Sequence, residues 1–572
     1  MSELPLRDSV RSLANICEPH LTRPAYKRLI RWLTDEAYAP YIADIHRLIE
    51  SENWVELQDS FRAVLPFGTG GRRGPRGVGP NRINARTIAE SACGLARWAM
   101  RNRKARGLGP DTATIVIAYD TRIMSEELAR VCAEVIAAQG CRALLFAEWR
   151  PTPQLSFAVR HHRADAGIVI SASHNPPSDN GFKAYGPDGG QLAPPHDAQV
   201  MRAVKALSGK PIASIPFEQA LDAGLVQYLG DSDDRAYRET VLAQGLCPDR
   251  NVRVVYTPLH GTGLRSIVPV LTEAGFHQLA LVESQATPDG SFSQVTNNKP
   301  NPEELPALDR AGAQARETDA HIAIGTDPDA DRLGCIAVDT RAVRTGGAKR
   351  WQALTGNQIG ALLCHHVLSS RRDSDRLRPD ALVLTTAVTS RMIAKIAASF
   401  GVAAIEELLV GFKYVARVIE SLADPDRMVF ACEESHGYLS GPYTRDKDAA
   451  PAALLLAEAA ARANARGGDL WQLLDDLYRQ YGYHCEVMFS EELNPVGGKA
   501  RIRRMTSGLR NHPPSRIANL KVSQITDRLN NTVLDPQTGQ RSPFAPIADP
   551  ATGEPLAALV APRDDLLIFD LA

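Results

Sequence analysis

The stretch that decides the fold is Ala166-Gly-Ile-Val-Ile170 followed by Ser171-Ala-Ser-His-Asn-Pro-Pro-Ser-Asp-Asn-Gly181. The first part is an apolar run typical of a buried strand. The second is a polar loop, and ligands of open α/β sheets bind beyond the carboxyl ends of the strands. Ser173, His174 and the later Lys183 offer a hydroxyl, an imidazole and an ammonium group, a candidate nucleophile with acid/base partners. The alternative is a capped turn, because Ser, Asn, Asp and Pro all favour turns.

The same succession of an apolar strand and a polar loop occurs twice more. The run Ile322–Ile324 leads into Gly325-Thr-Asp-Pro-Asp-Ala-Asp-Arg332, and the run Met428–Ala431 leads into Cys432-Glu-Glu-Ser-His-Gly437. Stretches with helical periodicity separate the strands, and such alternation is typical of largely parallel α/β sheets. We therefore expect an α/β fold with three similar mixed α/β domains around a central cleft, followed by a C-terminal α+β domain.

Length and composition agree with several compact domains. A chain of 572 residues exceeds a single hydrophobic core, and 44% hydrophobic with 23% charged residues is ordinary for globular proteins. The expected segments are an N-terminal helical extension (1–60), domain I with the Ser173 loop (61–215), domain II with the Asp327 loop (216–342), domain III with the Glu433 loop (343–480) and domain IV (481–572).

Charge, hydropathy and cysteine content exclude other classes of protein. The formal net charge of −1 gives no electrostatic reason to expect nucleic acid or an anionic membrane as partner. The first ten residues lack the apolar core that a signal peptide requires. No apolar run in the sequence approaches the roughly 20 residues of a membrane span. Nine dispersed cysteines without CxxC spacing predict reduced thiols in a cytoplasmic protein, with no disulfides and no zinc site. The oligomeric state is left open.

Three aspartates at alternate positions, Asp327, Asp329 and Asp331, form a candidate metal site. On an extended backbone alternate side chains share a face, so the three carboxylates are expected to converge. Their like charges require a cation, and an all-oxygen ligand set favours Mg²⁺ or Mn²⁺ over zinc. A calcium EF-hand is excluded, because its sixth and twelfth positions are Arg332 and Val338 here instead of Gly and Glu. The alternative is a solvated acidic turn.

A glycine-rich segment, Leu65-Pro-Phe-Gly-Thr-Gly-Gly-Arg-Arg-Gly74, precedes the serine loop. Closely spaced glycines let backbone N–H groups approach an anion, and Arg72 and Arg73 can hold that anion between them. Arg73 and Arg332 would also offset the negative charge that three carboxylates place near an anionic substrate. The alternative is a flexible loop with solvated arginines.

Glu433 and Ser435, with His436 beside them, follow the third strand. Paired acceptors and a hydroxyl suit the vicinal hydroxyls of a sugar, whereas a helix cap is the alternative. Lys413 and the run Arg445-Asp-Lys-Asp448 add cations, for which a charged surface turn is the alternative.

Taken together, these stretches resemble the motifs of the α-D-phosphohexomutase superfamily. The resemblance spans about residues 60–572 and is closest to the bacterial phosphoglucomutase branch that includes phosphopentomutase and glucose-1,6-bisphosphate synthase relatives. The matching segments are Phe67-Gly-Thr-Gly-Gly-Arg-Arg-Gly74, Tyr119-Asp-Thr-Arg122, Ser171-Ala-Ser-His-Asn-Pro176, Asn180-Gly-Phe-Lys183, Thr257-Pro-Leu-His-Gly-Thr-Gly263, Asp327-Pro-Asp-Ala-Asp-Arg332, Gly411-Phe-Lys413 and Glu433-Glu-Ser-His-Gly437.

The resemblance implies a reaction and a set of roles. Hexose 1-phosphate and hexose 6-phosphate, with glucose as the expected sugar, would interconvert through a phosphoserine enzyme and a 1,6-bisphosphate. Mg²⁺ would be the cofactor, glucose 1,6-bisphosphate the activator and sugar phosphates the small-molecule partners. The implied residues are Ser173 as phosphoryl carrier and metal ligand with the three aspartates, Lys183 as acid/base, Arg73 and Arg332 near the phosphate, and Gly411, Lys413, Glu433 and Ser435 at the sugar.

Several alternatives remain open. Phosphomannomutase or phosphopentomutase activity would differ by a few sugar contacts that the sequence does not settle. Superfamily members continue beyond a strand like Leu566–Ala572 into an Arg-x-Ser-Gly-Thr-Glu-Pro-like loop that binds phosphate, and no such segment is present, so a truncated domain IV is expected. Losing that loop removes remote binding energy, which makes a catalytically impaired relative that binds sugar phosphates another alternative. An unrelated metallophosphatase with a serine nucleophile is the last.

Overall fold

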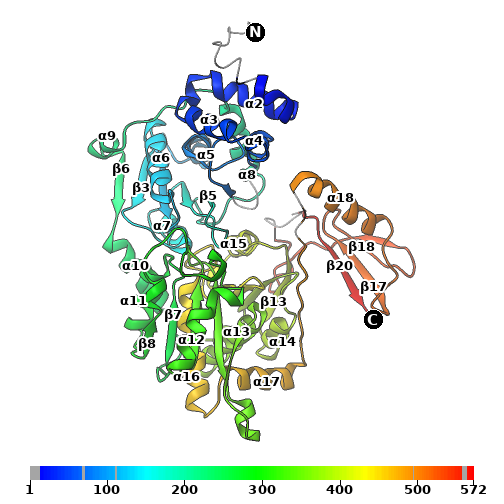
Figure 1. Ribbon diagram of the computed structural model, residues 1–572. Helices are drawn as coiled ribbons and strands as arrows, with labels where there is room; N and C mark the ends of the chain where they lie inside the picture. The colour runs from blue at the N-terminus through cyan, green and yellow to red at the C-terminus, as the bar shows by residue number, and fades with distance from the viewer. Residues whose placement is uncertain are drawn as a thin grey trace.

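The computed structural model describes residues 13, 15–66, 71–109, 112–491, 493, 495–556 and 563–572 (Figure 1). Residues 67–70 of the expected glycine loop lie outside the described residues. Three sheet units follow one another along the chain, and a fourth unit stands beside the third (Figure 1). None of the described helices has the length and apolarity needed to cross a membrane.

A small helical layer covers the start of the first sheet unit (Figure 1). Its core holds Trp32, whose ring stacks on Tyr38 with 4.4 Å between centroids. Arg82 of the first unit pairs with Asp59 of this layer at 2.7 Å, which fixes the layer to the unit. The helices are α2 (Arg23–Thr34), α3 (Ile42–Glu50) and α4 (Trp54–Phe61).

The first sheet unit has strands β1 (Gly71–Pro75), β2 (Thr114–Tyr119), β3 (Arg142–Phe146), β4 (Ala166–Ile170), β5 (Asp179–Tyr185) and β6 (Val226–Leu229). Its helices are α5 (Ala85–Ala105), α6 (Ser125–Ala138), α7 (Thr152–His161), α8 (His196–Leu207) and α9 (Phe217–Asp222). Alternate residues of β2 face opposite layers, as the pleat requires. Ile115 and Ile117 pack with α5 and α6, whereas Val116 and Ala118 pack with α7.

The second unit has strands β7 (Val254–Thr257), β8 (Leu279–Leu281), β9 (Ile322–Thr326), β10 (Leu333–Asp339) and β11 (Arg350–Leu354), with helices α10 (Asp231–Leu242), α11 (Gly263–Glu273) and α12 (Asp309–Glu317). The third has strands β12 (Leu382–Thr386), β13 (Ala403–Leu408), β14 (Met428–Glu433) and β15 (Gly437–Leu439), with helices α13 (Gly356–Asp373), α14 (Met392–Ser399), α15 (Phe412–Ser421), α16 (Ala449–Ala465) and α17 (Leu470–Tyr481). One large apolar cluster runs through both units, with the alanine- and leucine-rich α16 at its centre.

All three units share one strand arrangement. The neighbouring strands are β5-β4-β2-β3 in the first, β10-β9-β7-β8 in the second and β15-β14-β12-β13 in the third. In each set the first pair is antiparallel and the other two pairs are parallel. The antiparallel pair is a hairpin, and each of the three polar loops lies at the tip of its hairpin. The expectation of three similar mixed α/β units is therefore confirmed.

The fourth unit combines one sheet with helix α18 (Pro495–Asn511). It contacts the third unit through polar pairs: Arg528 donates to the Glu407 carbonyl at 2.8 Å, and Arg391 lies 3.0 Å from Asp570. Its strands are β16 (Arg516–Ile517), β17 (Leu520–Asp527), β18 (Thr532–Leu534), β19 (Arg541–Pro543) and β20 (Leu567–Leu571), the last paired with β17.

Candidate active site

The serine loop, residues 171–178, joins β4 to β5. Ser173 has φ +53°, a left-handed conformation that is uncommon outside glycine. Its N–H donates to Ser171 Oγ at 2.8 Å. A Cβ at Gly181 would lie 2.4 Å from the Ser171 carbonyl oxygen, so this close approach requires glycine. The loop is therefore held in a single shape that directs the Ser173 hydroxyl to the second unit.

Arg122, just beyond β2, is a candidate that the sequence analysis did not single out. Its guanidinium is buried, and Asp120 lies 3.4 Å from its Nε. The pKa of Arg122 is lowered by burial, although Asp120 opposes the shift. The guanidinium donates to four backbone carbonyls of the serine loop and β5, those of Ser173, Asn175, Pro176 and Asp179. The signal that could have found it is its place in Tyr119-Asp-Thr-Arg122, directly after a strand.

The three aspartates occupy the hairpin between β9 and β10. Their backbone forms a turn with Ala330 at φ +49°, so the expectation of an extended segment is wrong. Because a turn folds the chain back, it still brings one oxygen of each carboxylate within 4.8 Å of the others, on a buried face. Asp327 Oδ1 stabilises the turn by accepting the N–H of Asp331 at 3.1 Å and of Arg332 at 3.0 Å.

The serine loop and the aspartate turn meet across the boundary between two units. Ser173 Oγ donates to Asp327 Oδ2 at 2.6 Å, and His174 Nδ1 lies 3.2 Å from the same Oγ. Burial, together with the charges of Arg332 and Arg73, holds the pKa of His174 well below its usual value. The His174 imidazole is therefore neutral at pH 7, with one ring nitrogen as a hydrogen-bond donor and the other as an acceptor.

Lys183 reaches the same cluster from β5. Its Nζ contacts Asp329 Oδ2 and lies 3.2 Å from Asp331 Oδ2. Thr152, the first residue of α7, donates its hydroxyl to Asp329 Oδ2 at 2.7 Å and its N–H to the Asp329 carbonyl at 2.9 Å. Burial alone would raise the pKa of Asp329, but Lys183 and Thr152 hold it well below its usual value. The ammonium group of Lys183 thus already offsets part of the negative charge of the aspartate turn.

The third hairpin, between β14 and β15, packs against the aspartate turn. The Leu333 N–H donates to the His436 carbonyl at 3.0 Å, and His436 Nδ1 lies 3.0 Å from the Leu333 carbonyl oxygen. Lys447, shortly after this hairpin, lies 3.4 Å from Asp331 Oδ2. Glu433 Oε1 is buried and has no hydrogen-bond partner among the described residues. Side chains from three sheet units therefore meet at one place.

The other residues singled out from the sequence surround this cluster. Arg73 lies on β1 opposite Gly181, and Arg332 forms an ion pair with Glu303. Ser435 is half-buried at the tip of the third hairpin. Gly411, with φ +116°, directly precedes helix α15, and Lys413 lies in the first turn of that helix, where burial lowers its pKa.

Charged residues at three places in the chain are buried instead of solvated. Arg72 donates to the Leu65 carbonyl at 3.0 Å and to the Thr87 carbonyl at 2.9 Å, so the expectation that it holds an anion is wrong. The run 445–448 is no more than 8% exposed, which excludes the surface-turn alternative for it. Lys413, 7% exposed in a helix, excludes the same alternative.

The aspartate turn fits a hard divalent cation. Asp329 Oδ1 and Asp331 Oδ1 are buried and lack hydrogen-bond partners among the described residues. Burial and the two neighbouring carboxylates raise the pKa of Asp327 well above its usual value, a repulsion that a cation would relieve. The three candidate ligands are all carboxylates, and such a ligand set favours Mg²⁺ or Mn²⁺.

Glu433 makes the stability of this site depend on pH. Burial raises its pKa from 4.5 to about 7, with Lys447 and Arg332 opposing the shift. Because the folded state binds this proton more tightly than the unfolded chain, its stabilising contribution is complete below pH 4.5 and is lost as the pH rises through about 7. In urea titrations from about pH 4 to pH 8, we expect the free energy of unfolding of Glu433→Gln to fall less with pH than that of the wild type. Parallel curves would contradict this.

Comparison with known proteins agrees with this architecture. Family models described as "Phosphoglucomutase/phosphomannomutase, alpha/beta/alpha domain" I, II and III match residues 65–210, 236–340 and 355–481. The phosphoglucomutases of Staphylococcus aureus strains bovine RF122 / ET3-1 and MSSA476 are 35% and 34% identical over 496 residues, 86% of this chain and 86% of theirs.

Solved structures show the same fold. A putative phosphomannomutase from Thermus thermophilus superimposes with a TM-score of 0.57 at 23% identity, covering 73% of this chain and 84% of its own. A phosphoglucomutase/phosphomannomutase family protein from Burkholderia thailandensis gives 0.59 at 20% identity, covering 83% and 89%. The chain therefore belongs to the phosphoglucomutase/phosphomannomutase family of the α-D-phosphohexomutase superfamily and is an isomerase of the phosphotransferase type, as its motifs predicted.

Proposed function

We propose that this enzyme interconverts glucose 1-phosphate and glucose 6-phosphate, with Ser173 as the carrier of the phosphoryl group. The observation that carries the proposal is the 2.6 Å hydrogen bond from Ser173 Oγ to Asp327 Oδ2, between the hairpins of two different units. A hydroxyl at the edge of three converging carboxylates is where a phosphate on serine could share a cation with them. The phosphoglucomutase names of its relatives support glucose as the sugar.

In the proposed reaction the phosphoryl group moves from Ser173 Oγ to a free hydroxyl of the sugar phosphate. The P–Oγ bond breaks, a bond from phosphorus to the sugar oxygen forms, Ser173 Oγ gains a proton and the sugar hydroxyl loses one. Lys183 is our candidate for this exchange, since its ammonium would give a proton to Oγ and then take up the proton of the hydroxyl. The product is a hexose 1,6-bisphosphate. Its other phosphoryl group then returns to Ser173, so the intermediate must turn around in the site between the two transfers. Free glucose 1,6-bisphosphate would load the serine in the first place.

The chain's residues would position and neutralise, which is most of what phosphoryl transfer requires. Asp327, Asp329 and Asp331 would hold Mg²⁺ with an oxygen of the phosphate on Ser173. Bound there, the ion would supply charge neutralisation at the transferring group. His174, kept neutral, would donate a hydrogen bond from Nδ1 to Ser173 Oγ, because the one hydroxyl proton of Ser173 goes to Asp327 and a phosphorylated Oγ has none.

The remaining cations and the third hairpin would bind the substrate. Arg73 and Arg332 would lie near its phosphate, and Glu433, Ser435 and His436 with the Gly411–Lys413 segment would face the sugar. Ser173 and Lys183 are each only 1% exposed, so transfer in this arrangement would be shielded from water, which would otherwise hydrolyse the phosphoserine. Access for the sugar would require the units to separate.

The proposal is tested by a coupled assay that follows glucose 6-phosphate. The purified chain would receive glucose 1-phosphate, Mg²⁺ and a trace of glucose 1,6-bisphosphate. Parallel reactions on mannose 1-phosphate and ribose 1-phosphate would be followed through their own products, mannose 6-phosphate and ribose 5-phosphate. We expect turnover that depends on the bisphosphate and is fastest with glucose. Release of inorganic phosphate equal to the substrate consumed would instead show a phosphatase, and faster turnover of mannose or ribose phosphate would overturn the choice of sugar.

Removal of the metal gives a second measurement. We expect EDTA to stop turnover, and excess Mg²⁺ to restore it and to stabilise the folded protein by about 2.7 kcal/mol at a hundred times its Kd. Asp329→Asn removes one proposed ligand, so its thermal unfolding should no longer respond to Mg²⁺. Asp309→Asn, a change at an exposed aspartate on α12, is the matched control and should respond as the wild type does. An equal response in all three proteins would place the ion elsewhere.

A cytoplasmic location also belongs to this proposal. All nine cysteines are free thiols in the structure, and seven of them are buried. Disulfides form and persist in oxidising compartments, whereas thiols stay reduced in the cytosol. A chain with free thiols therefore suits the cytoplasm. Immunofluorescence of the tagged protein, or cell fractionation, would test this location.

A further inference from the structure

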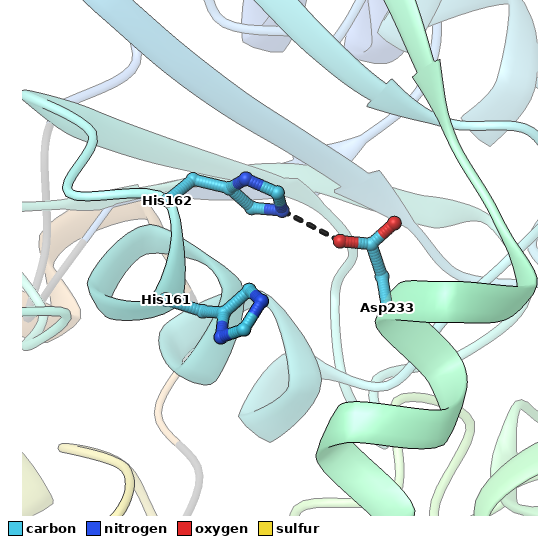
Figure 2. Close-up of side chains that lie close together, drawn as sticks. All are labelled: His161, His162 and Asp233. Carbon is cyan, nitrogen blue, oxygen red and sulfur yellow. Dashed lines mark hydrogen bonds and ion pairs between the residues drawn. The ribbon is translucent and has the colours of Figure 1, made fainter.

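A second cluster of possible metal ligands lies away from the aspartate turn. It joins His161 and His162, at the end of α7, to Asp233 in the first turn of α10 (Figure 2). One ring nitrogen of each histidine and one carboxylate oxygen all lie within 4.8 Å of one another. His162 Nε2 is 2.6 Å from Asp233 Oδ1, and Figure 2 shows the His161 ring lying beside this pair.

The three side chains are held in place by their surroundings. The other oxygen of Asp233, Oδ2, accepts the Gly230 N–H at 3.1 Å, which leaves Oδ1 directed at the histidines. The His161 ring stacks on Phe157, 5.3 Å between centroids, and stands perpendicular to the His162 ring at 5.1 Å. Asp233 therefore offers a third possible ligand atom, Oδ1, whose orientation is fixed by the hydrogen bond to Oδ2. Ligands in metal sites are commonly oriented by such outer hydrogen bonds.

We propose that His161, His162 and Asp233 form a binding site for a zinc-class transition-metal ion. Two imidazoles and one carboxylate are a ligand set that zinc uses with an open fourth position, whereas Mg²⁺ prefers oxygen ligands alone. Ligands about 2.0–2.1 Å from a tetrahedral ion stand about 3.3 Å apart. The present separations need only small side-chain shifts to reach that value. The sequence-based expectation of no zinc site considered cysteines alone and did not weigh this pair of histidines.

The exposure of the cluster suits an ion that exchanges with solvent. The His161 side chain is exposed, His162 is 28% exposed and Asp233 is 10% exposed. An ion there would have one protected side, toward Asp233, and one open side for water or an incoming ligand. It would replace the direct contact between His162 Nε2 and Asp233 Oδ1.

The ion would link two parts of the molecule. Helix α7 begins at Thr152, which bonds to Asp329 of the aspartate turn, and ends at the histidines. Helix α10 packs on α7 and also on α11 and α16 of the second and third units. Arg150, just before α7, already pairs with Asp234 of α10 at 2.7 Å. A metal ion beside this pair would add a second tie between the first unit and the rest.

Cobalt is the probe, because tetrahedral Co²⁺ absorbs visible light and replaces zinc at such sites. The full chain, with Cys485→Ser to remove the exposed thiol and with excess Mg²⁺ to occupy oxygen-only sites, would be titrated with Co²⁺ and then with Zn²⁺ as competitor. We expect one equivalent of Co²⁺ to bind with a tetrahedral spectrum that Zn²⁺ abolishes. His161→Ala should weaken the Co²⁺ Kd by at least about tenfold, the effect of losing even an outer-shell partner.

His161→Ala is the decisive variant, since this side chain is exposed and takes no part in the His162–Asp233 bond. His277→Ala, a change at another exposed histidine, is the matched control and should leave the titration unchanged. Asp329→Asn should also leave the Co²⁺ spectrum intact, which separates this site from the aspartate turn. Co²⁺ binding that is unsaturable, or equally tight in His161→Ala and the parent, would overturn the proposal whether or not the protein proves to be a glucose phosphate mutase.

Discussion

Ser173→Ala is expected to lower turnover of glucose 1-phosphate by about 10⁴- to 10⁶-fold, the range found when one member is removed from a set of catalytic groups that act as a unit. The hydroxyl is the only atom of this side chain that can carry the phosphoryl group. Its donor hydrogen bond to Asp327 Oδ2 and its contact with His174 Nδ1 are lost in the variant. The measurement is the coupled assay at saturating substrate, together with mass spectrometry of the intact protein after incubation with glucose 1,6-bisphosphate.

Two comparisons separate chemistry from folding in this experiment. Ser178→Ala alters an exposed serine of the same loop and should retain both turnover and phosphorylation. The unfolding temperature of Ser173→Ala should lie within a few degrees of that of the wild type. Serine already adopts the left-handed conformation here, and alanine has a similar backbone cost in that conformation. Substantial turnover by a folded Ser173→Ala protein, or a phosphoryl group found on another residue, would remove Ser173 from the mechanism.

Arg122→Met is expected to destabilise the protein by about 3–5 kcal/mol, the cost of breaking a buried ion pair on one side. Asp120 would be left buried without its cation, and burial already raises the pKa of that carboxyl. The four carbonyls that Arg122 contacts would lose the guanidinium as a donor as well. Urea titration would measure the loss of stability, and the coupled assay the accompanying loss of turnover.

Arg122→Lys distinguishes a positioning role from a merely structural one. Lysine keeps the charge beside Asp120, but a single ammonium cannot donate in the several fixed directions of a guanidinium. We therefore expect Arg122→Lys to recover part of the stability while phosphorylation of Ser173 by glucose 1,6-bisphosphate remains slow. Arg130→Met, a change at an arginine whose side chain is 42% exposed, serves as the control. A wild-type rate of Ser173 phosphorylation in Arg122→Lys would show that the shape of the serine loop does not depend on the guanidinium.

The local sequence identified the main loops of this enzyme because each follows an apolar strand. Ala166–Ile170 is a strand with the expected bounds, and the polar residues beyond it lie at the tip of a hairpin. The convergence of the three aspartates was also predictable from their spacing, although the backbone achieves it by a turn at Ala330. An apolar run followed by polar residues shows where a loop lies in the sequence. The backbone conformation of that loop depends on tertiary packing, which the sequence pattern does not show.

What the sequence could not show were contacts made to backbone atoms far along the chain. Arg122 binds carbonyls of residues more than 50 positions away, and a carbonyl has no side-chain signature. The burial of Arg72 and of the run 445–448 was missed for a related reason. A charged side chain is normally solvated, and only the packed structure shows that Arg72 has carbonyl partners inside the unit.

The meeting of three hairpins, each from its own sheet, has a consequence for heat sensitivity. The second and third units share one apolar core, but the first unit has cores of its own. Its contacts with the other two units are expected to open at lower free energy than the sheets themselves, because interfaces between units are less extensive than cores. Warming will thus separate Ser173 from Asp327 while every sheet is still folded. Loss of activity should occur at a lower temperature than the unfolding transition seen by calorimetry, and it should reverse on cooling. The upper working temperature of this enzyme would then be set by the contacts between its units and not by the stability of its cores.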